Sequence, residues 1–411
     1  MQQQQPRDVL IVGAGPAGLA LAIALSDAGL AVTVVDAQPR EGLAAPPEDG
    51  RDIALTHASV DTLRALGLWQ RLLPGEIGRI REARVIDGDR QDAALRFVAP
   101  GWATEALGWI VPNHALRRAS FAAAAERAGV QLLTGTQVQR VEVRSSHAEL
   151  ELAPKTAPEA AQRLQGRLLV AADSRFSSTR RQLGIGVDMV DFGRTMIVCR
   201  MRHERPHDDI AYECFGYERT LAVLPAVGAE SSVVVTTDGA SAARLMALPE
   251  AEFAALVQRQ FRDRFGAMHL SGPRHPYPLV ATWARRFAAP RAVLVGDAAV
   301  GMHPVTAHGY NLGLRSVELL SQALAEALAQ RRDIAQPAVL EGYERAHRRG
   351  SAVLYHGTNA VARLYASNGA PQRLARRLLL DGAQRLPPLK AAIVAQLTRA
   401  AGGRRAAAGE A

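Results

Sequence analysis

The feature that most constrains this 411-residue chain is a glycine motif that directly follows an apolar segment near the N-terminus. Residues 9–12 are apolar and typical of a buried strand, and the segment GAGPAG at residues 13–18 comes next. Residues 19–28, which are rich in alanine and leucine, predict a helix that ends at Gly29. A strand, a glycine turn and a helix in this order predict a dinucleotide-binding unit.

Each glycine of this motif has its own physical role. Gly13 permits the tight turn, Gly15 lets the backbone approach a pyrophosphate, and Gly18 lets the helix pack closely on the strand. The start of the helix offers unpaired N–H groups and partial positive charge to the phosphates. A second apolar strand at residues 31–35 ends at Asp36, whose carboxylate can accept hydrogen bonds from a ribose. The motif predicts a dinucleotide but does not specify which one.

A second glycine motif, late in the chain, narrows that choice. Residues 291–295 predict a strand that ends at Gly296 and Asp297, and a glycine-rich segment at 303–313 opens an apolar helix. Asp297 can accept a hydrogen bond from a polyol hydroxyl. The N–H groups at the opening of the helix can face anionic charge, such as that on a reduced flavin ring. A nicotinamide enzyme does not need this second cradle, so the pair of motifs favours FAD over NAD.

Four segments together carry a family resemblance, at residues 9–36, 51–60, 171–181 and 291–316. They resemble the class A flavin monooxygenases, the group of para-hydroxybenzoate hydroxylase, with the ubiquinone-biosynthesis hydroxylases as the nearest branch. The resemblance implies an α/β fold in which a Rossmann-like FAD-binding domain is interleaved with an antiparallel-sheet substrate domain and followed by C-terminal helices. The FAD-binding residues that we predict are Gly13, Gly15, Ala17, Gly18, Asp36, Arg51, Asn113, Asp173, Gly296, Asp297, Pro304, Gly309, Asn311, Leu312 and Gly313.

The order of the segments predicts discontinuous domains. Residues 195–237 have the composition of successive strands without helices between them, which favours an antiparallel sheet between two parts of the cofactor domain. The predicted boundaries are 1–80, 110–190 and 280–330 for the FAD-binding domain, 81–109 and 191–279 for the β-rich substrate domain, 331–401 for a C-terminal helical region and 402–411 for a disordered tail.

The sequence departs from the family pattern at three places. Ser174 stands where the motif that begins near Asp173 usually has glycine, which brings direct reduction by a nicotinamide into question. Ala307 and His308 replace a glycine and a glutamine before Gly309, and this brings an imidazole near the expected flavin. His308 is the candidate for direct assistance to catalysis, with a structural histidine as the alternative. Ser316 replaces an acidic residue.

The excess of basic residues is concentrated near the C-terminus. Residues 371–411 contain eight basic and two acidic side chains, so they carry six of the nine excess positive charges. Interleaved leucines make this segment basic and amphipathic, which suits an anionic membrane surface. A solvated helix pair that packs on the flavin domain is the alternative. No nucleic-acid recognition module accompanies the basic segment, so we predict no nucleic-acid partner.

The remaining composition predicts a folded cytoplasmic protein. Hydrophobic residues make up 48% of the chain, which contains no run of about 18 uncharged apolar residues that could span a bilayer. The first six residues lack the features of a signal peptide. Cys199 and Cys214 form neither a redox pair nor a metal motif, and no metal is predicted. The basic C-terminal segment is a candidate for peripheral contact with the inner face of the membrane. The sequence does not determine whether the protein forms a homo-oligomer.

The resemblance implies an FAD-dependent monooxygenase that hydroxylates the ring of a polyprenylated phenol in ubiquinone biosynthesis. Reduced FAD would react with O2 to form a C4a-hydroperoxide, with electrons from NAD(P)H or a partner reductase. Partners would be the prenylated substrate, a membrane surface and a ubiquinone-biosynthesis assembly. Three alternatives stay open: a hydroxylase of a soluble aromatic compound, a flavin-dependent prenyl reductase, and a catalytically silent FAD-binding member of an assembly. The ring position is not specified by the sequence.

Overall fold

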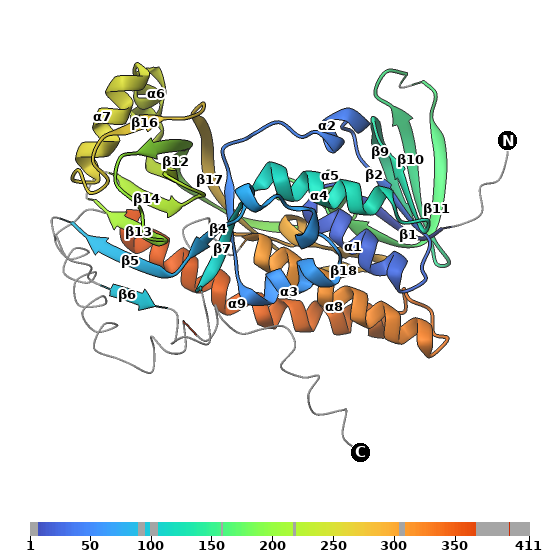
Figure 1. The fold of residues 1–411 in the computed structure, drawn as a ribbon. Coiled ribbons are helices and arrows are strands. Elements are labelled where there is room, and N and C mark those ends of the chain that lie inside the picture. The colour runs from blue at the N-terminus through green and yellow to red at the C-terminus, as the bar shows by residue number, and fades with distance from the viewer. Residues whose placement is uncertain are drawn as a thin grey trace.

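The structure is a computed structural model that describes residues 7–88, 95–98, 106–157, 159–216, 219–303, 309–366 and 394. Within these residues the strands form one sheet of eight, one of nine and one of three. Helices pack on the eight-stranded sheet, and two further helices pack on the nine-stranded sheet (Figure 1). The predicted α/β fold with two kinds of sheet and helices late in the chain is confirmed.

The eight-stranded sheet is built around the N-terminal strand. Its members are β1 (Arg7–Val12), β2 (Val32–Val35), β8 (Val130–Leu133), β9 (Thr136–Val143), β10 (Ala148–Pro154), β11 (Gln162–Ala171), β18 (Ala288–Ala289) and β19 (Ala292–Leu294). The order β19-β11-β1-β2-β8 is parallel throughout, and β9 and β10 form an antiparallel extension on β11. Val9, Leu10 and Ile11 are fully buried because helices or strands cover both faces of a central parallel strand.

Helix α1 (Pro16–Asp27) follows the first glycine motif and packs against α4 (Asn113–Ala125) and α8 (Gly309–Ala329). Both α1 and α8 begin at their glycine motifs, a few residues before the apolar stretches that predicted them. Proline occupies the first turn of α1, where its missing N–H costs nothing. The two motifs therefore lie at helix openings, as the sequence predicts.

The nine-stranded sheet is antiparallel except where β13 pairs with β5. Its members are β5 (Glu82–Asp87), β6 (Leu95–Val98), β12 (Val187–His203), β13 (Ile210–Phe215), β14 (Thr220–Pro225), β15 (Glu230–Asp238), β16 (Met268–Leu270), β17 (His275–Ala284) and β20 (Val300–Gly301). Helices α6 (Gly239–Ala247) and α7 (Glu250–Gln260) cover one face (Figure 1). The chain thus leaves the first sheet for this one and returns to it, while the predicted domain boundaries stay a prediction.

The three-stranded sheet joins segments from both regions. It contains β3 (Asp52–Leu55), β7 (Gly108–Pro112) and β4 (Gly78–Ile80) in that order. Outside this sheet, the short helices are α2 (Arg40–Ala44), α3 (His57–Ala65) and α5 (Ser178–Gln182). The long helix α9 (Pro337–Ala366) packs on α8. In the part of the chain that the structure describes, no helix is both long and apolar enough to cross a membrane. The basic segment 371–411 lies outside the described residues except for position 394.

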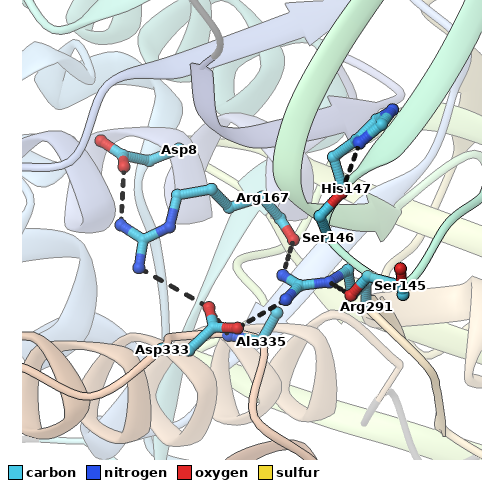
Figure 2. Close-up of polar contacts among 8 residues, drawn as sticks. All are labelled: Asp8, Ser145, Ser146, His147, Arg167, Arg291, Asp333 and Ala335. Atoms are coloured by element: carbon cyan, nitrogen blue, oxygen red, sulfur yellow. Dashed lines mark hydrogen bonds and ion pairs between the residues drawn. The ribbon is translucent and has the colours of Figure 1, made fainter.

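An ion-pair network holds the first sheet against the connection between α8 and α9 (Figure 2). Arg167 of β11 pairs with Asp8 of β1 at 3.1 Å and with Asp333 at 3.6 Å. Arg291, just before β19, pairs with Asp333 at 2.7 Å and donates to the carbonyl oxygens of Ser145 at 2.6 Å and Arg167 at 3.1 Å. Burial acts to raise the pKa of Asp333, but Arg291 and Arg167 lower it overall. The network stabilises the beginnings of the parallel strands.

We expect Arg291→Met to lower the free energy of unfolding by about 1–2 kcal/mol at pH 7, because Asp333 and two carbonyl groups lose charged donors. Asp333 has a folded-state pKa below 3.8, so its contribution is present above pH 3.8 and is lost as the pH falls further. The difference between variant and parent should therefore shrink in acid. Denaturant unfolding of the variant and the parent at pH 7 and below pH 3.8 tests this. Arg285→Met is the control, since its pair with Asp188 is 69% and 61% exposed.

Candidate active site

Two adjoining cavities lie at the carboxyl ends of the parallel strands. The larger has a volume of about 720 Å³ and the smaller about 390 Å³. Gly15, Arg117, Ala172 and Ser174 line both cavities, so the two spaces meet at the first glycine turn. The crevice at the carboxyl ends of the strands is where open α/β sheets bind ligands. An extended ligand can therefore lie with one end in each cavity.

The glycines of the first motif are required by close backbone contacts. Gly13 has a φ of +109°, and a Cβ atom there would lie 2.5 Å from the carbonyl oxygen of Ala172. A Cβ at Gly18 would lie 2.1 Å from the carbonyl oxygen of Gly13. A Cβ at Gly15 would meet nothing within 4 Å and would project into open space beside the cavities. The predicted turn, close packing and ligand approach thus each have a geometric basis.

Asp36 lines the smaller cavity at the end of β2. One carboxylate oxygen accepts a hydrogen bond from the Ala14 N–H and the other from the Gln38 N–H, both at 2.7 Å. Each oxygen retains a lone pair because a carboxylate can accept about four hydrogen bonds. The backbone therefore orients Asp36 for a diol such as a ribose.

Arg51 and Asn113, two predicted FAD-binding residues from distant segments, both contact Asp49, which was not predicted from the sequence. Asp49 accepts hydrogen bonds from Arg51 at 2.6 Å and from the Asn113 side chain at 2.8 Å, and Tyr277 donates to its carbonyl oxygen at 2.7 Å. Burial acts to raise the pKa of Asp49, but Arg51 and Asn113 lower it overall. Arg51 and Asn113 line the larger cavity, and Asp49 holds them together there.

The second motif also lines the larger cavity. Gly296, at a φ of +61°, turns the chain so that Asp297 faces the cavity, and Asp297 pairs with Arg175 at 3.0 Å. Arg175 also donates to the carbonyl oxygen of Val280 at 2.8 Å. Gly309 and Gly313 line the same cavity, so α8 opens onto it. Arg175 and Arg117 are cavity residues that the sequence analysis did not list as contacts.

Ser316, one of the departures from the family pattern, is fully buried between these elements. Its hydroxyl donates to the carbonyl oxygen of Gly313 at 2.6 Å and accepts from the N–H of Gly296 at 3.2 Å. A small hydroxyl residue can make both contacts in this confined space, and an acidic side chain is not required. Ser316 therefore ties the second glycine turn to the opening of α8.

Asn311 and Leu312 lie beside the cavities without lining either one. The Asn311 side chain accepts from the Thr56 N–H at 3.1 Å and the Ser59 hydroxyl at 2.6 Å, and it donates to the Ala54 carbonyl at 2.9 Å. Leu312 is buried in the core. Both residues thus position the opening of α8. The remaining predicted residues of this segment, Pro304 and His308, lie outside the described residues, as does Ala307.

The middle motif lies where the cavities meet. Asp173 lines the smaller cavity and accepts hydrogen bonds from the Ser177 hydroxyl and from the Thr179 N–H at the start of α5. Ser174 has a φ of +76°, a conformation that glycine adopts more readily. The turn expected for glycine is therefore kept, at a cost of about 1–2 kcal/mol for a residue with a Cβ atom.

The walls of the larger cavity include several ionisable groups with shifted pKa values, among them His303 and Glu213. Burial, together with the charge of Arg175, lowers the pKa of His303 to about 4, so this imidazole is neutral at pH 7. Its ring packs edge-on against Phe192 with centroids 4.6 Å apart. Burial raises the pKa of Glu213 on β13 to about 8. The sequence analysis missed Glu213, although an acidic residue within an apolar strand is a signal that could have drawn attention to it.

Comparison with known proteins identifies the family to which the chain is similar. Residues 7–356 match the model of the FAD binding domain family. The ubiquinone hydroxylase UbiM of Neisseria meningitidis is 44% identical over 95% of this chain and 84% of its own length. The ubiquinone hydroxylase UbiL of Rhodospirillum rubrum is 37% identical over 93% and 87%. The crystal structure of p-nitrophenol 4-monooxygenase PnpA from Pseudomonas putida has the same fold, with a TM-score of 0.76 and 18% identity over 95% of this chain and 97% of its own.

We expect Gly15→Asp to fold normally and lose FAD. Gly15 has an extended conformation at the N-cap of α1, where aspartate is a favourable residue, and its Cβ meets no neighbour. A carboxylate about 4 Å from a pyrophosphate charge is repelled by about 4 kcal/mol near a protein surface. The FAD content and melting temperature of the purified variant test this. Gly75→Asp, the same change at an exposed site with open space around it, is the control and should retain FAD.

We expect Ser316→Ala to lower the free energy of unfolding by about 1–3 kcal/mol, because the Gly296 N–H is left buried without its acceptor. It should also weaken FAD binding, since Gly296 and Gly313 both line the larger cavity. Chemical denaturation and FAD titration measure the two effects. Ser321→Ala on the same helix is the control, because Ser321 is only half-buried and donates to a helix carbonyl. Equal losses in both variants would contradict the role of Ser316.

Proposed function

The chain belongs to the FAD-binding domain family and is an FAD-dependent aromatic hydroxylase, and we propose that its substrate is the ring of a polyprenylated phenol in ubiquinone biosynthesis. The substrate class rests on the named relatives, and the structural observation that most supports an FAD-dependent hydroxylase is the pair of joined cavities lined by the two glycine motifs. The smaller cavity holds Asp36, and the larger combines the second glycine turn with an apolar sheet wall. A cofactor and an aromatic ring can thus lie in one continuous space.

We propose that the residues of the two motifs hold FAD along this space. Asp36 would bind the ribose of the adenosine half, and the turn at Gly15 with the start of α1 would face the pyrophosphate. Asp297 and the opening of α8 at Gly309 would face the flavin half. The open space at Gly15, where a Cβ would meet no atom, fits this placement. When bound, FAD supplies the activation of O2, with electrons from NAD(P)H or a partner reductase.

The chain itself would position the substrate ring and exclude water. Met196, Val198, Ala222, Leu224 and Val234 line the larger cavity with apolar side chains. An apolar wall holds an aromatic ring and keeps solvent from the reacting atoms. Asp49 keeps Arg51 and Asn113 at the same cavity, and Asp297 keeps Arg175 there. These contacts would limit the ring to a few orientations, and holding reactants in the correct orientation lowers the barrier to reaction.

We also propose that the protein contacts a membrane, binds a partner in an assembly and associates with itself. Membrane contact rests on the basic amphipathic segment at 371–411, which suits an anionic surface beside a membrane-embedded prenyl tail, whereas the assembly partner rests on the resemblance to ubiquinone-biosynthesis hydroxylases. The relatives that support the substrate class are ubiquinone hydroxylases by name.

The experiment for the substrate class uses a bacterial strain that lacks its own ring hydroxylases of ubiquinone biosynthesis and expresses this chain. We expect mass analysis of the lipid extract to reveal hydroxylated prenylated intermediates, and their fragmentation gives the ring position. Gly15→Asp should abolish these products, whereas Gly75→Asp should retain them. If the precursors stay unchanged while the purified protein carries FAD, the substrate is not a ubiquinone precursor, and soluble aromatic compounds become the next substrates to assay.

A further inference from the structure

Alternation along the strands gives the nine-stranded sheet two buried faces. Tyr212 and Cys214 of β13 project into the core beneath α6 and α7. Glu213 and Phe215 project the other way and line the larger cavity. The same strand therefore contributes to a packed core on one face and to a ligand cavity on the other.

Strand register surrounds Glu213 with apolar neighbours. Glu213 lies opposite Val85 of β5 and Ala222 of β14. The row continues through Val234 of β15 to Val198 of β12. Paired residues of neighbouring strands project from the same face, so the carboxyl lies in a transverse row of four apolar side chains. Three of these neighbours, Ala222, Val234 and Val198, also line the larger cavity.

The Glu213 carboxyl has no hydrogen-bond or ion-pair partner within the residues that the structure describes. The side chain is partly exposed, but the space that it faces is the cavity. Burial raises its pKa to about 8, so most of the carboxyl is protonated at neutral pH. In that form it offers one O–H donor and an acceptor oxygen.

A polar group among apolar neighbours is costly unless it finds a hydrogen-bond partner, which protein, water or ligand can supply. The occupant of the cavity is the available source of a partner. An aromatic ring that carries a hydroxyl matches a neutral carboxyl well, because each can donate one hydrogen bond and accept another. A ring without oxygen could form no hydrogen bond with Glu213.

We propose that Glu213 is the hydrogen-bond anchor for the ring hydroxyl of the aromatic substrate, an inference that rests on the proposed function. The carboxyl oxygen accepts a hydrogen bond from the ring hydroxyl, and the carboxyl O–H donates one to the oxygen of that hydroxyl. The apolar row on either side holds the ring carbons. Glu213 thereby selects rings that carry oxygen and sets the direction in which the ring enters.

The test compares 2-prenylphenol with prenylbenzene, which differ only in the ring hydroxyl. Binding to the oxidised FAD-loaded protein is followed by the change in flavin absorbance, without a reductant. In Glu213→Leu, the preference for the phenol should fall by about ten- to hundredfold, as expected when a polar group loses its partner in an apolar site. Glu213→Gln should keep the preference within about threefold, because an amide both donates and accepts.

Two further measurements separate this role from a structural one. Glu213→Leu should retain FAD and melt at or above the temperature of the parent, since a leucine completes the apolar row. The infrared band of a protonated carboxyl at neutral pH should disappear in Glu213→Gln. Thr236→Val, which removes a hydroxyl from the same cavity wall, is the matched control and should keep the phenol preference.

The outcomes are distinguishable. An unchanged preference in Glu213→Leu, or an equal weakening of both ligands, would overturn the anchor while leaving hydroxylation of prenylated phenols intact. If the parent protein binds neither ligand and produces no hydroxylated lipid in cells, the proposed function and the anchor both fail. Loss of the preference in Glu213→Leu with retention in Glu213→Gln and Thr236→Val supports the anchor.

Discussion

The close approach of the first glycine turn to the end of β11 is the constraint on which the rest of the site depends. A Cβ at Gly13 would lie 2.5 Å from the Ala172 carbonyl oxygen, so the two chain segments can meet only through glycine. That meeting sets the start of α1 at the carboxyl edge of the sheet and joins the two cavities at Gly15 and Ser174. The ion pairs of Arg167 and Arg291 hold the strand beginnings and leave this edge open to a ligand.

The second sheet serves two purposes because strand side chains alternate. Val233 and Val235 pack in the core beneath α6 and α7, while Val234 and Thr236 line the cavity. A single sheet can thus be stabilised by burial on one face and hold a substrate on the other. Burial disfavours a charged group, and it shifts the pKa values of Glu213 and His303 at the cavity towards their neutral forms.

The departures from the family pattern have different physical explanations. Ser316 makes two buried hydrogen bonds that join Gly296 to Gly313, so its hydroxyl holds the second glycine turn against the start of α8. Ser174 keeps the left-handed turn that glycine would adopt, and its side chain is exposed at the junction of the cavities. A replacement that looks unfavourable in a motif can therefore preserve the backbone and still change the surface that a ligand contacts.

The sequence by itself determined the elements whose signal is local. The glycine spacing and the apolar strands predicted both cofactor turns, and the run of strand-like segments at 195–237 predicted the antiparallel sheet, because these patterns arise from backbone geometry and side-chain period. Only the tertiary structure decided which distant residues meet. Asp49 joins Arg51 to Asn113, Arg175 pairs with Asp297, and strand register sets Glu213 among apolar neighbours facing a cavity. Such contacts depend on how strands pair and pack across the whole chain, and neither propensity nor spacing along the sequence encodes them.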